Sequence, residues 1–181
     1  MSPLVIATWN VEYGLGPELN RRRRALLDEI AADVWVLTEI HSSLTPGDQY
    51  LPAASSQRQG PGRVSPRSSW ATVRVRRELQ PKAVQTSDSV RTAACLVNSD
   101  DANLLVFGTV FPWIGDQERP DFVTEMNAQR DDWMRLGEEN HAELGAAGDF
   151  NVYLVPRPAT VARLTSSRRA RPCALQFRQM M

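Results

Sequence analysis

Residues 33–40 of the chain read DVWVLTEI, a short apolar run that ends in a carboxylate. Its length and its apolar residues predict a buried strand that brings Glu39 to its carboxyl end. Upstream, residues 3–11 read PLVIATWNV and predict another buried strand, which ends near Asn10. Between the two, residues 18–32 repeat apolar side chains at helical spacing. Strand, helix and strand in this order predict an α/β layer with the helix packed outside.

Further strands, one long loop and a second helix are expected downstream. Residues 42–67 are rich in Ser, Pro, Gly, Gln and Arg, which predicts a surface loop. Strand-like segments follow at residues 68–75, 91–99, 103–113 and 146–154. A helix is predicted from Asp121 to Leu144, with an apolar face formed by Phe122, Met126, Trp133 and Leu136. Beyond Pro156 no strand pattern is clear, so residues 156–181 are predicted to be a disordered or aberrant tail after a domain at residues 1–155.

Composition excludes several classes of protein. The chain has 21 basic and 21 acidic residues, which argues against a polybasic clamp for nucleic acid or membrane. The run Arg21 to Arg24 is interpreted as a solvated helix face. Cys95 lies in an apolar segment and is interpreted as a buried thiol. No segment resembles a signal peptide or a membrane span, so we expect a soluble, cytoplasmic protein.

Polar side chains follow several of the predicted strands. Asn10 and Glu39 end the first two, and residues 143–154, ELGAAGDFNVYL, bring Asp149 and Asn151 to the last. Alone, an Asn after a strand is usually a turn residue and a lone Glu is usually at the surface. As a set, they offer the oxygen ligands that Mg²⁺ prefers, with Asp149 left to orient or deprotonate a water.

Three segments in this order resemble the motifs of the endonuclease/exonuclease/phosphatase superfamily: IATWNV, DVWVLTE and GDFN. The resemblance covers residues 4–154. It implies an α/β fold of the α+β type, a DNase I-like sandwich of two sheets flanked by outer helices, here incomplete at its C-terminus. It also implies phosphoester hydrolysis dependent on Mg²⁺ or Mn²⁺.

The resemblance assigns roles residue by residue. Asn10 and Glu39 would hold the metal ion. Asp149 would position or activate the attacking water, and Asn151 would bind the scissile phosphate. Substrates in such a family include nucleic acids, phosphoinositides, sphingomyelin and smaller phosphates, and this sequence does not select among them or indicate a protein partner.

The sequence departs from the family pattern at two places. Residues 108–113, GTVFPW, replace the common Thr-His-Leu, so Thr109 is either a phosphate donor or an ordinary strand hydroxyl. The family closes with an Asp-His pair, whereas His41 and His141 both precede GDFN. His41 follows Glu39 closely, and His141 is better explained by a position near the end of a helix.

Three hypotheses therefore remain. The first is a metal-dependent phosphoester hydrolase of the nuclease or phosphatase type. The alternative is a catalytically impaired or inactive truncated member of that family, which the Arg-rich tail favours. A plain binding module that uses residues 42–67 has no positive feature in the sequence.

Overall fold

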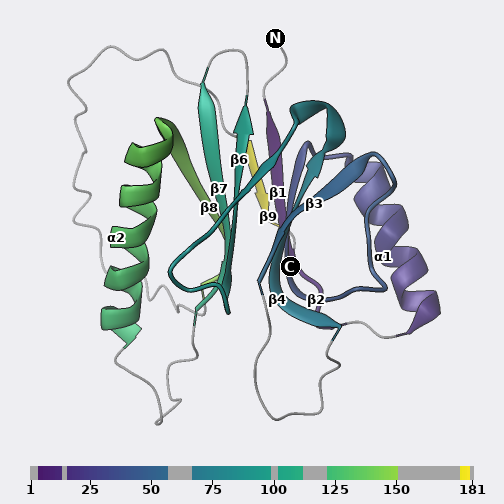
Figure 1. Ribbon diagram of the computed structural model, residues 1–181. Coiled ribbons are helices and arrows are strands. Elements are labelled where there is room, and N and C mark those ends of the chain that lie inside the picture. Colours follow the sequence, from purple (N-terminus) through teal and green to yellow (C-terminus); the bar gives the residue numbers. More distant parts are fainter. Residues whose placement is uncertain are drawn as a thin grey trace, which may run out of the picture.

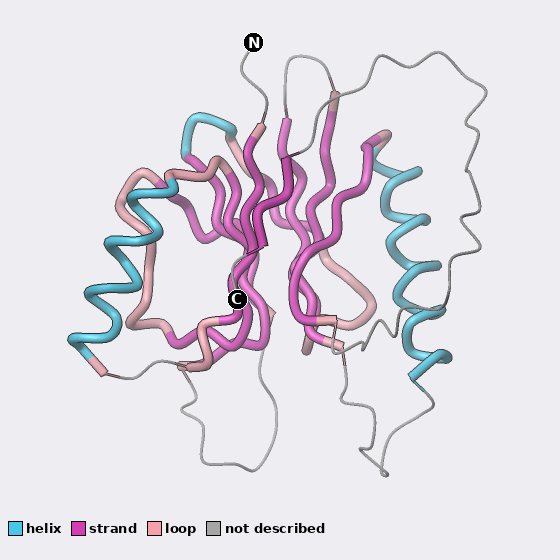
Figure 2. The backbone as a smooth tube through the Cα atoms, turned by 180° about the vertical axis from the view of Figure 1, so that it is seen from behind, coloured by secondary structure: helices cyan, strands magenta, loops and turns pink. Residues whose placement is uncertain are grey.

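The computed structural model describes residues 4–13, 16–56, 67–98, 102–111, 122–150 and 176–179. Within them, two sheets pack face to face, and one helix covers each outer face (Figures 1 and 2). This is the two-sheet α+β sandwich with outer helices that the sequence predicts.

The first sheet has the strand order β3-β4-β2-β1-β9. Its elements are β1 (Val5–Asn10), α1 (Pro17–Ile30), β2 (Val34–His41), β3 (Tyr50–Ser55), β4 (Ser68–Arg76) and β9 (Gln176–Gln179). Strand β1 runs parallel to β2, and the crossover between them is α1. Strand β4 pairs antiparallel with both β2 and β3.

The second sheet has the strand order β5-β6-β7-β8. Its strands are β5 (Lys82–Val84), β6 (Thr92–Asn98), β7 (Asn103–Val110) and β8 (Ala142–Asp149), and a short 3₁₀ turn, η1 (Arg77–Leu79), precedes them. Strand β7 runs parallel to β8 with α2 (Phe122–Asn140) as the crossover. Each sheet therefore contains one parallel β-α-β unit whose helix lies outside the sandwich.

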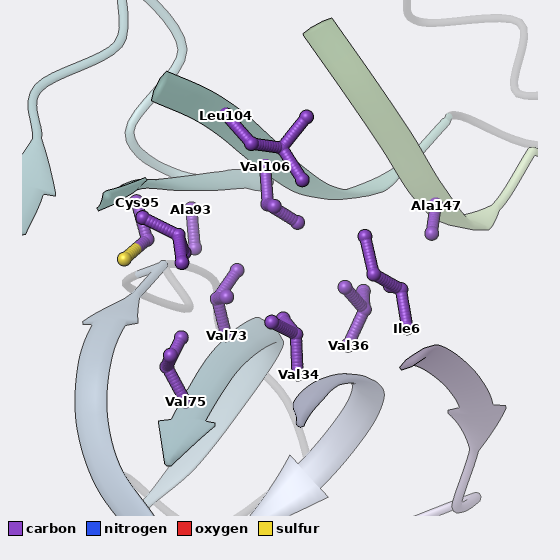
Figure 3. Close-up of a cluster of buried hydrophobic side chains, with 11 residues drawn as sticks. Ile6, Val34, Val36, Val73, Val75, Ala93, Cys95, Leu104, Val106 and Ala147 are labelled. Atoms are coloured by element: carbon purple, nitrogen blue, oxygen red, sulfur yellow. The ribbon is translucent and has the colours of Figure 1, made fainter. Parts of the chain in front are cut away.

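Apolar side chains from both sheets fill the space between them (Figure 3). The cluster comprises Ile6, Val34, Val36, Val73, Val75, Ala93, Cys95, Val97, Leu104, Val106 and Ala147. Gly108 sets the distance of closest approach, because a Cβ there would lie 3.0 Å from Val36 and 3.2 Å from Val73. A larger side chain here would require the two valines to shift by a few tenths of an ångström.

The helices bury one face each against the sheets. On α1, Leu27 is fully buried and packs with Trp35 and Leu37 of β2. On α2, Leu136 is buried, and the Trp133 ring stacks on Phe107 with centroids 5.0 Å apart. These contacts follow from apolar residues that recur every three or four positions along each helix.

The predicted loop at residues 42–67 is wrong in part, because β3 lies inside it. Tyr50 anchors this strand: its ring joins the cluster under α1, and its hydroxyl donates to the Ala32 carbonyl at 2.6 Å. The pairing with β4 shifts register between Pro52 and Ala54. Pro and Ser residues hide the strand pattern at an edge position, where a missing N–H is tolerated.

Other boundaries also differ from the predictions. Helix α2 ends at Asn140, before the expected Leu144, because residues 142–149 pair with β7. Met126 is 38% exposed and does not belong to the buried face, while the Phe122 side chain lies outside the described part. Strand β5 was not expected, and β9 pairs with β1 in a tail where no strand was predicted.

The interpretation of Cys95 is confirmed. This residue is fully buried between the sheets, and the burial raises the pKa of its thiol to about 12. The interpretation of the arginine run is confirmed in part: Arg21, Arg22 and Arg24 are exposed on α1, and the first two form ion pairs with Glu18, whereas Arg23 is half-buried. Among the described helices, none has both the length and the hydropathy that a bilayer span requires.

Leu27→Ala is expected to lower the free energy of unfolding by about 2–5 kcal/mol, because it leaves a cavity between α1 and the first sheet. Leu19 lies on the same helix and is 47% exposed, so Leu19→Ala is the matched control and should change stability by less than about 0.5 kcal/mol. Urea unfolding followed by circular dichroism measures both. Equal effects of the two substitutions would contradict the packing of α1 described above.

Candidate functional site

The inward faces of three strands change from apolar to polar toward the same end of the sandwich. On β1, Ile6 lies in the core between the sheets, and two and four residues further come Thr8 and Asn10. On β2 the buried Val36 is followed by Thr38, and on β8 Ala147 is followed by Asp149. Alternate residues share a face of a strand, so these polar side chains face the other sheet.

A hydrogen bond joins the two sheets at this end. The Asn10 side-chain Nδ2 donates to Oδ2 of Asp149 at 3.0 Å, across 139 positions of sequence. The other amide atom, Oδ1 of Asn10, accepts from the Glu12 backbone N–H at 3.0 Å. Both ends of the amide are therefore engaged, and the local turn orients the group that contacts Asp149.

Backbone hydrogen bonds attach the segment after β1 to the end of β2. The Val11 N–H donates to the Thr38 carbonyl at 3.0 Å, and the Tyr13 N–H donates to the Glu39 carbonyl at 2.6 Å. Asn10 also lies opposite Thr38 in the register of the parallel pair. These bonds fix Asn10 one position away from Glu39 across the two strands.

Glu39 interrupts the regular geometry of β2. Its φ is +50°, in the left-handed region that non-glycine residues rarely adopt. The alternation of faces changes at this residue: Val34 and Val36 face the second sheet, whereas Ile40 packs with Trp35 and Leu37 under α1. The direction of the side chains therefore changes at Glu39, although the register of β2 with β4 is the same before and after it. Such local strain is common at functional sites.

Asp149 owes its position to the glycine before it. Gly148 has a φ of +139°, and a Cβ at this residue would lie 2.0 Å from the Thr109 carbonyl oxygen. Immediately after it, the Asp149 carbonyl accepts from the Phe111 N–H at 2.9 Å. The Phe150 ring then packs against Phe111, with centroids 5.3 Å apart. Only glycine permits this approach of β8 to β7.

The donor set fits a hard divalent cation. Glu39 supplies a carboxylate and Asn10 an amide oxygen, which matches the preference of Mg²⁺ for one or two carboxylates completed by waters and substrate phosphate. Within the described residues, no group of three or more His, Cys, Asp or Glu side chains gathers as a protein-only metal cage.

Asn151 and Thr109 are the two other residues for which the sequence suggests a contact with phosphate. Asn151 lies outside the described residues, so its role stays a prediction. The Thr109 hydroxyl is fully buried on the α2 side of β7, 2.9 Å from the Thr92 hydroxyl and 3.3 Å from Oε1 of Gln129. It is therefore an ordinary strand hydroxyl in a buried polar network, which is one of the two alternatives that the sequence left open.

The two histidines lie at opposite ends of the sandwich. His41 is the last residue of β2, two positions after Glu39. His141 is exposed in the turn between α2 and β8, near the end of the helix as the sequence predicts. Strand β8 separates it from Asp149 by roughly 25 Å. Of the two, only His41 is near the site.

Sequence reasoning missed several features of the site. The glycine of GDFN was visible but was interpreted only as a weakness of the strand. The aromatic pair of Tyr13 and Trp70, with ring centroids 6.2 Å apart, links the turn after β1 to β4 and had no sequence signal. The same holds for the packing of Phe150 on Phe111.

Several solved structures have the same fold, and some of them are named as nucleases. The endonuclease domain of TRAS1, a telomere-specific non-LTR retrotransposon, matches with a TM-score of 0.59 at 12% identity over 84% of this chain. TDP2 of D. rerio complexed with a single-strand DNA product matches with a TM-score of 0.59 at 18% identity over 84%. An endonuclease/exonuclease/phosphatase from Bacteroides vulgatus matches with a TM-score of 0.56 at 15% identity over 84%.

The chain spans 63%, 62% and 67% of these three structures respectively. No model of a protein family matches the sequence, and a search of curated proteins found no match. The likeness shows the fold alone, which is the DNase I-like sandwich of two sheets with outer helices.

Gly148→Ala is expected to destabilise the protein by at least about 2 kcal/mol, because it places a Cβ against a backbone carbonyl at a strained φ. Gly145 on the same strand is the matched control, since a Cβ there meets only Leu104 at 3.8 Å. Gly145→Ala should be close to neutral in thermal unfolding. Similar melting temperatures for the two variants would contradict the close approach of β7 and β8.

Proposed function

We propose that this chain carries the site of a metal-dependent phosphoester hydrolase. The observation that supports the proposal most directly is the hydrogen bond between Asn10 and Asp149, made next to Glu39 at one end of the sandwich. This bond joins a residue of the first sheet to a residue of the second, beyond the apolar side chains that fill the rest of the interface. The fold shared with solved endonucleases supports the same class of reaction.

Glu39 would be the chief ligand of Mg²⁺ or Mn²⁺, with Oδ1 of Asn10 beside it. When bound, the ion supplies positive charge next to the phosphoryl oxygens. The left-handed backbone at Glu39 and the bonds from Val11 and Tyr13 to the Thr38 and Glu39 carbonyls fix the backbone from which this carboxylate projects. A ligand fixed in advance loses little conformational entropy on binding.

Asp149 would orient the attacking water and accept its proton. The Asn10 amide donates to one carboxylate oxygen and so fixes the orientation of the group that would contact the water. Asn151, two residues further along the chain, would donate its amide to the scissile phosphate. Because the backbone is confined at Gly148, the carboxylate has little freedom to leave this geometry.

DNA is the first substrate to test, since one solved structure of the same fold is TDP2 with a single-strand DNA product. The neutral net charge of the chain gives no general attraction to polyanions, so binding would depend on the metal and on local contacts. Smaller phosphoesters are the alternative substrates.

A second candidate is a metal- and phosphate-binding site without appreciable turnover. The observation that favours it is that the described residues contain no group of three or more His, Cys, Asp or Glu side chains that could hold a metal ion, whereas the family resemblance implies an Asp-His pair at the site. Loss of one preorganised donor typically lowers the rate by about a hundredfold to a thousandfold. Under this candidate, metal affinity persists and hydrolysis does not.

Glu39→Gln is expected to weaken Mn²⁺ binding by at least about tenfold, because it removes the only carboxylate that β1 and β2 bring to the site. Isothermal titration calorimetry measures the affinity. Glu29 is exposed on α1, so Glu29→Gln is the control and should bind Mn²⁺ like the wild type. An unchanged affinity of Glu39→Gln would refute its assignment as the ligand.

Hydrolysis of bis-p-nitrophenyl phosphate and of single-stranded DNA in Mn²⁺ then separates the two candidates. Slow turnover that falls by at least about a hundredfold in Asp149→Asn supports the hydrolase. Metal binding without turnover supports the second candidate. Turnover that Asp149→Asn leaves intact would contradict the role of Asp149.

A further inference from the structure

We propose that Asp88 and Gln129 are positioning residues, which hold Asp149 in place from the opposite side of the second sheet. The inference rests on the proposed function, in which Asp149 orients the attacking water, and it adds two residues that the three motifs do not include. Hydrogen bonds lead from the Asp88 carboxylate by two routes to the end of β7, which pairs with β8 at Asp149.

Asp88 lies in the connection between β5 and β6, and both oxygens of its carboxylate accept hydrogen bonds. Oδ1 accepts from the backbone N–H groups of Val90 and Arg91, at 3.1 Å and 3.2 Å. Oδ2 accepts from Nε2 of Gln129 on α2 at 3.2 Å. One partly buried carboxylate thereby joins the connection before β6 to the helix that covers the second sheet (Figure 1).

The first route passes through side chains buried on the α2 side of the second sheet. Oε1 of Gln129 accepts from the Thr109 hydroxyl at 3.3 Å, and the Thr92 hydroxyl lies 2.9 Å from that of Thr109. An ionised carboxylate only accepts hydrogen bonds, so Nε2 of Gln129 must face Asp88 and Oε1 must face Thr109. The single hydroxyl hydrogen of Thr109 goes to Gln129, and Thr92 therefore donates to Thr109. Asp88 thus sets the direction of every hydrogen bond along this route.

The second route passes through the backbone. The Arg91 N–H donates to Asp88, and the Arg91 carbonyl accepts from the Val110 N–H at 3.3 Å. Because the first route reaches Thr109 and the second reaches Val110, both end at adjacent residues of β7.

These two residues of β7 are the partners of Gly148 and Asp149 in the parallel pair with β8. The Thr109 carbonyl confines Gly148, and the Phe111 N–H donates to the Asp149 carbonyl at 2.9 Å. A shift of this end of β7 would therefore move Asp149 with it. The Thr109 side chain points toward α2 and that of Asp149 toward the first sheet, so the relay acts from behind the strands.

Burial makes the relay sensitive to the loss of one member. Thr109 is fully buried, and Thr92 and Gln129 are nearly so, which keeps solvent from replacing a lost partner. A buried donor or acceptor without a partner is costly, so the end of β7 would shift until its hydroxyl found another one.

Gln129→Glu is expected to break the relay, because it places a second carboxylate where Asp88 requires a donor. Hydrogen exchange of backbone amides, followed by NMR, measures the result at the site. The Phe111 amide, bonded to the Asp149 carbonyl, should exchange at least about tenfold faster than in the wild type. The Val11 amide, bonded to β2 in the first sheet, should change by less than about threefold.

A second substitution supplies the rescue. Asp88→Asn added to Gln129→Glu moves the charge from the connection to the helix: the asparagine oxygen accepts from Arg91, and its NH₂ group donates to the new carboxylate. This double variant should return the Phe111 exchange rate to within about threefold of the wild type. Asn127→Asp adds the same charge at an exposed position of α2, so it is the matched control and should exchange like the wild type.

The kinetics of bis-p-nitrophenyl phosphate hydrolysis report on the positioning of Asp149. Gln129→Glu should lower kcat by at least about tenfold and change KM little, because the displaced carboxylate orients the water poorly. Its Mn²⁺ affinity should stay within about threefold of the wild type, since Glu39 lies on the other sheet.

Failure of this inference and failure of the proposed function give different results. Unchanged exchange at Phe111 in Gln129→Glu, equal acceleration at Phe111 and Val11, or no recovery in the double variant would each refute the relay, while the hydrolase assignment stands. Where Gln129→Glu does not fold, Gln129→Met takes its place, since it removes both hydrogen bonds and adds no charge. If the wild type neither binds Mn²⁺ nor hydrolyses the substrate, the proposed function fails, and the exchange rates still decide whether the relay holds the Asp149 backbone.

Discussion

The close packing of the two sheets is the constraint on which the site depends. Gly108 allows β7 to approach within contact distance of Val36 and Val73, and apolar side chains fill the space on either side of it. At this separation a short side chain from one sheet can reach a short side chain from the other. Asn10 and Asp149 form such a contact. The apolar core thus sets the geometry of the polar site above it.

The site also concentrates backbone conformations that cost stability. Glu12, Tyr13 and Glu39 all have positive φ, and all lie where the segment after β1 bonds to the end of β2. Each left-handed non-glycine residue costs roughly 1–2 kcal/mol, so the surrounding hydrogen bonds and packing must compensate. Thr38, buried beside them, has a hydroxyl with no hydrogen-bond partner among the described residues. Such a concentration of costly conformations is common at functional sites, and it falls here at the site proposed above.

Sequence patterns predicted the strands that are buried on both faces, because continuous apolar runs such as residues 33–40 have few alternative structures. They failed for β3, where Pro52 and serines at a sheet edge resemble a loop, and for the end of α2, where pairing with β7 decides the boundary. The polar residues at the strand ends were predicted as a set. Their contact, the reversal at Glu39 and the approach at Gly148 could not be, since each depends on backbone geometry that only the packed sheets impose.

A double-mutant cycle on Asn10 and Asp149 tests most directly whether the two sheets assemble one site. The free energies of unfolding of Asn10→Ala, Asp149→Ala and the double variant would be measured by urea denaturation. The account predicts a coupling of about 1 kcal/mol or more, because the hydrogen bond has a charged acceptor and is partly buried. Additive effects, with a coupling below about 0.3 kcal/mol, would show that the two side chains do not interact, and the site described above would be contradicted.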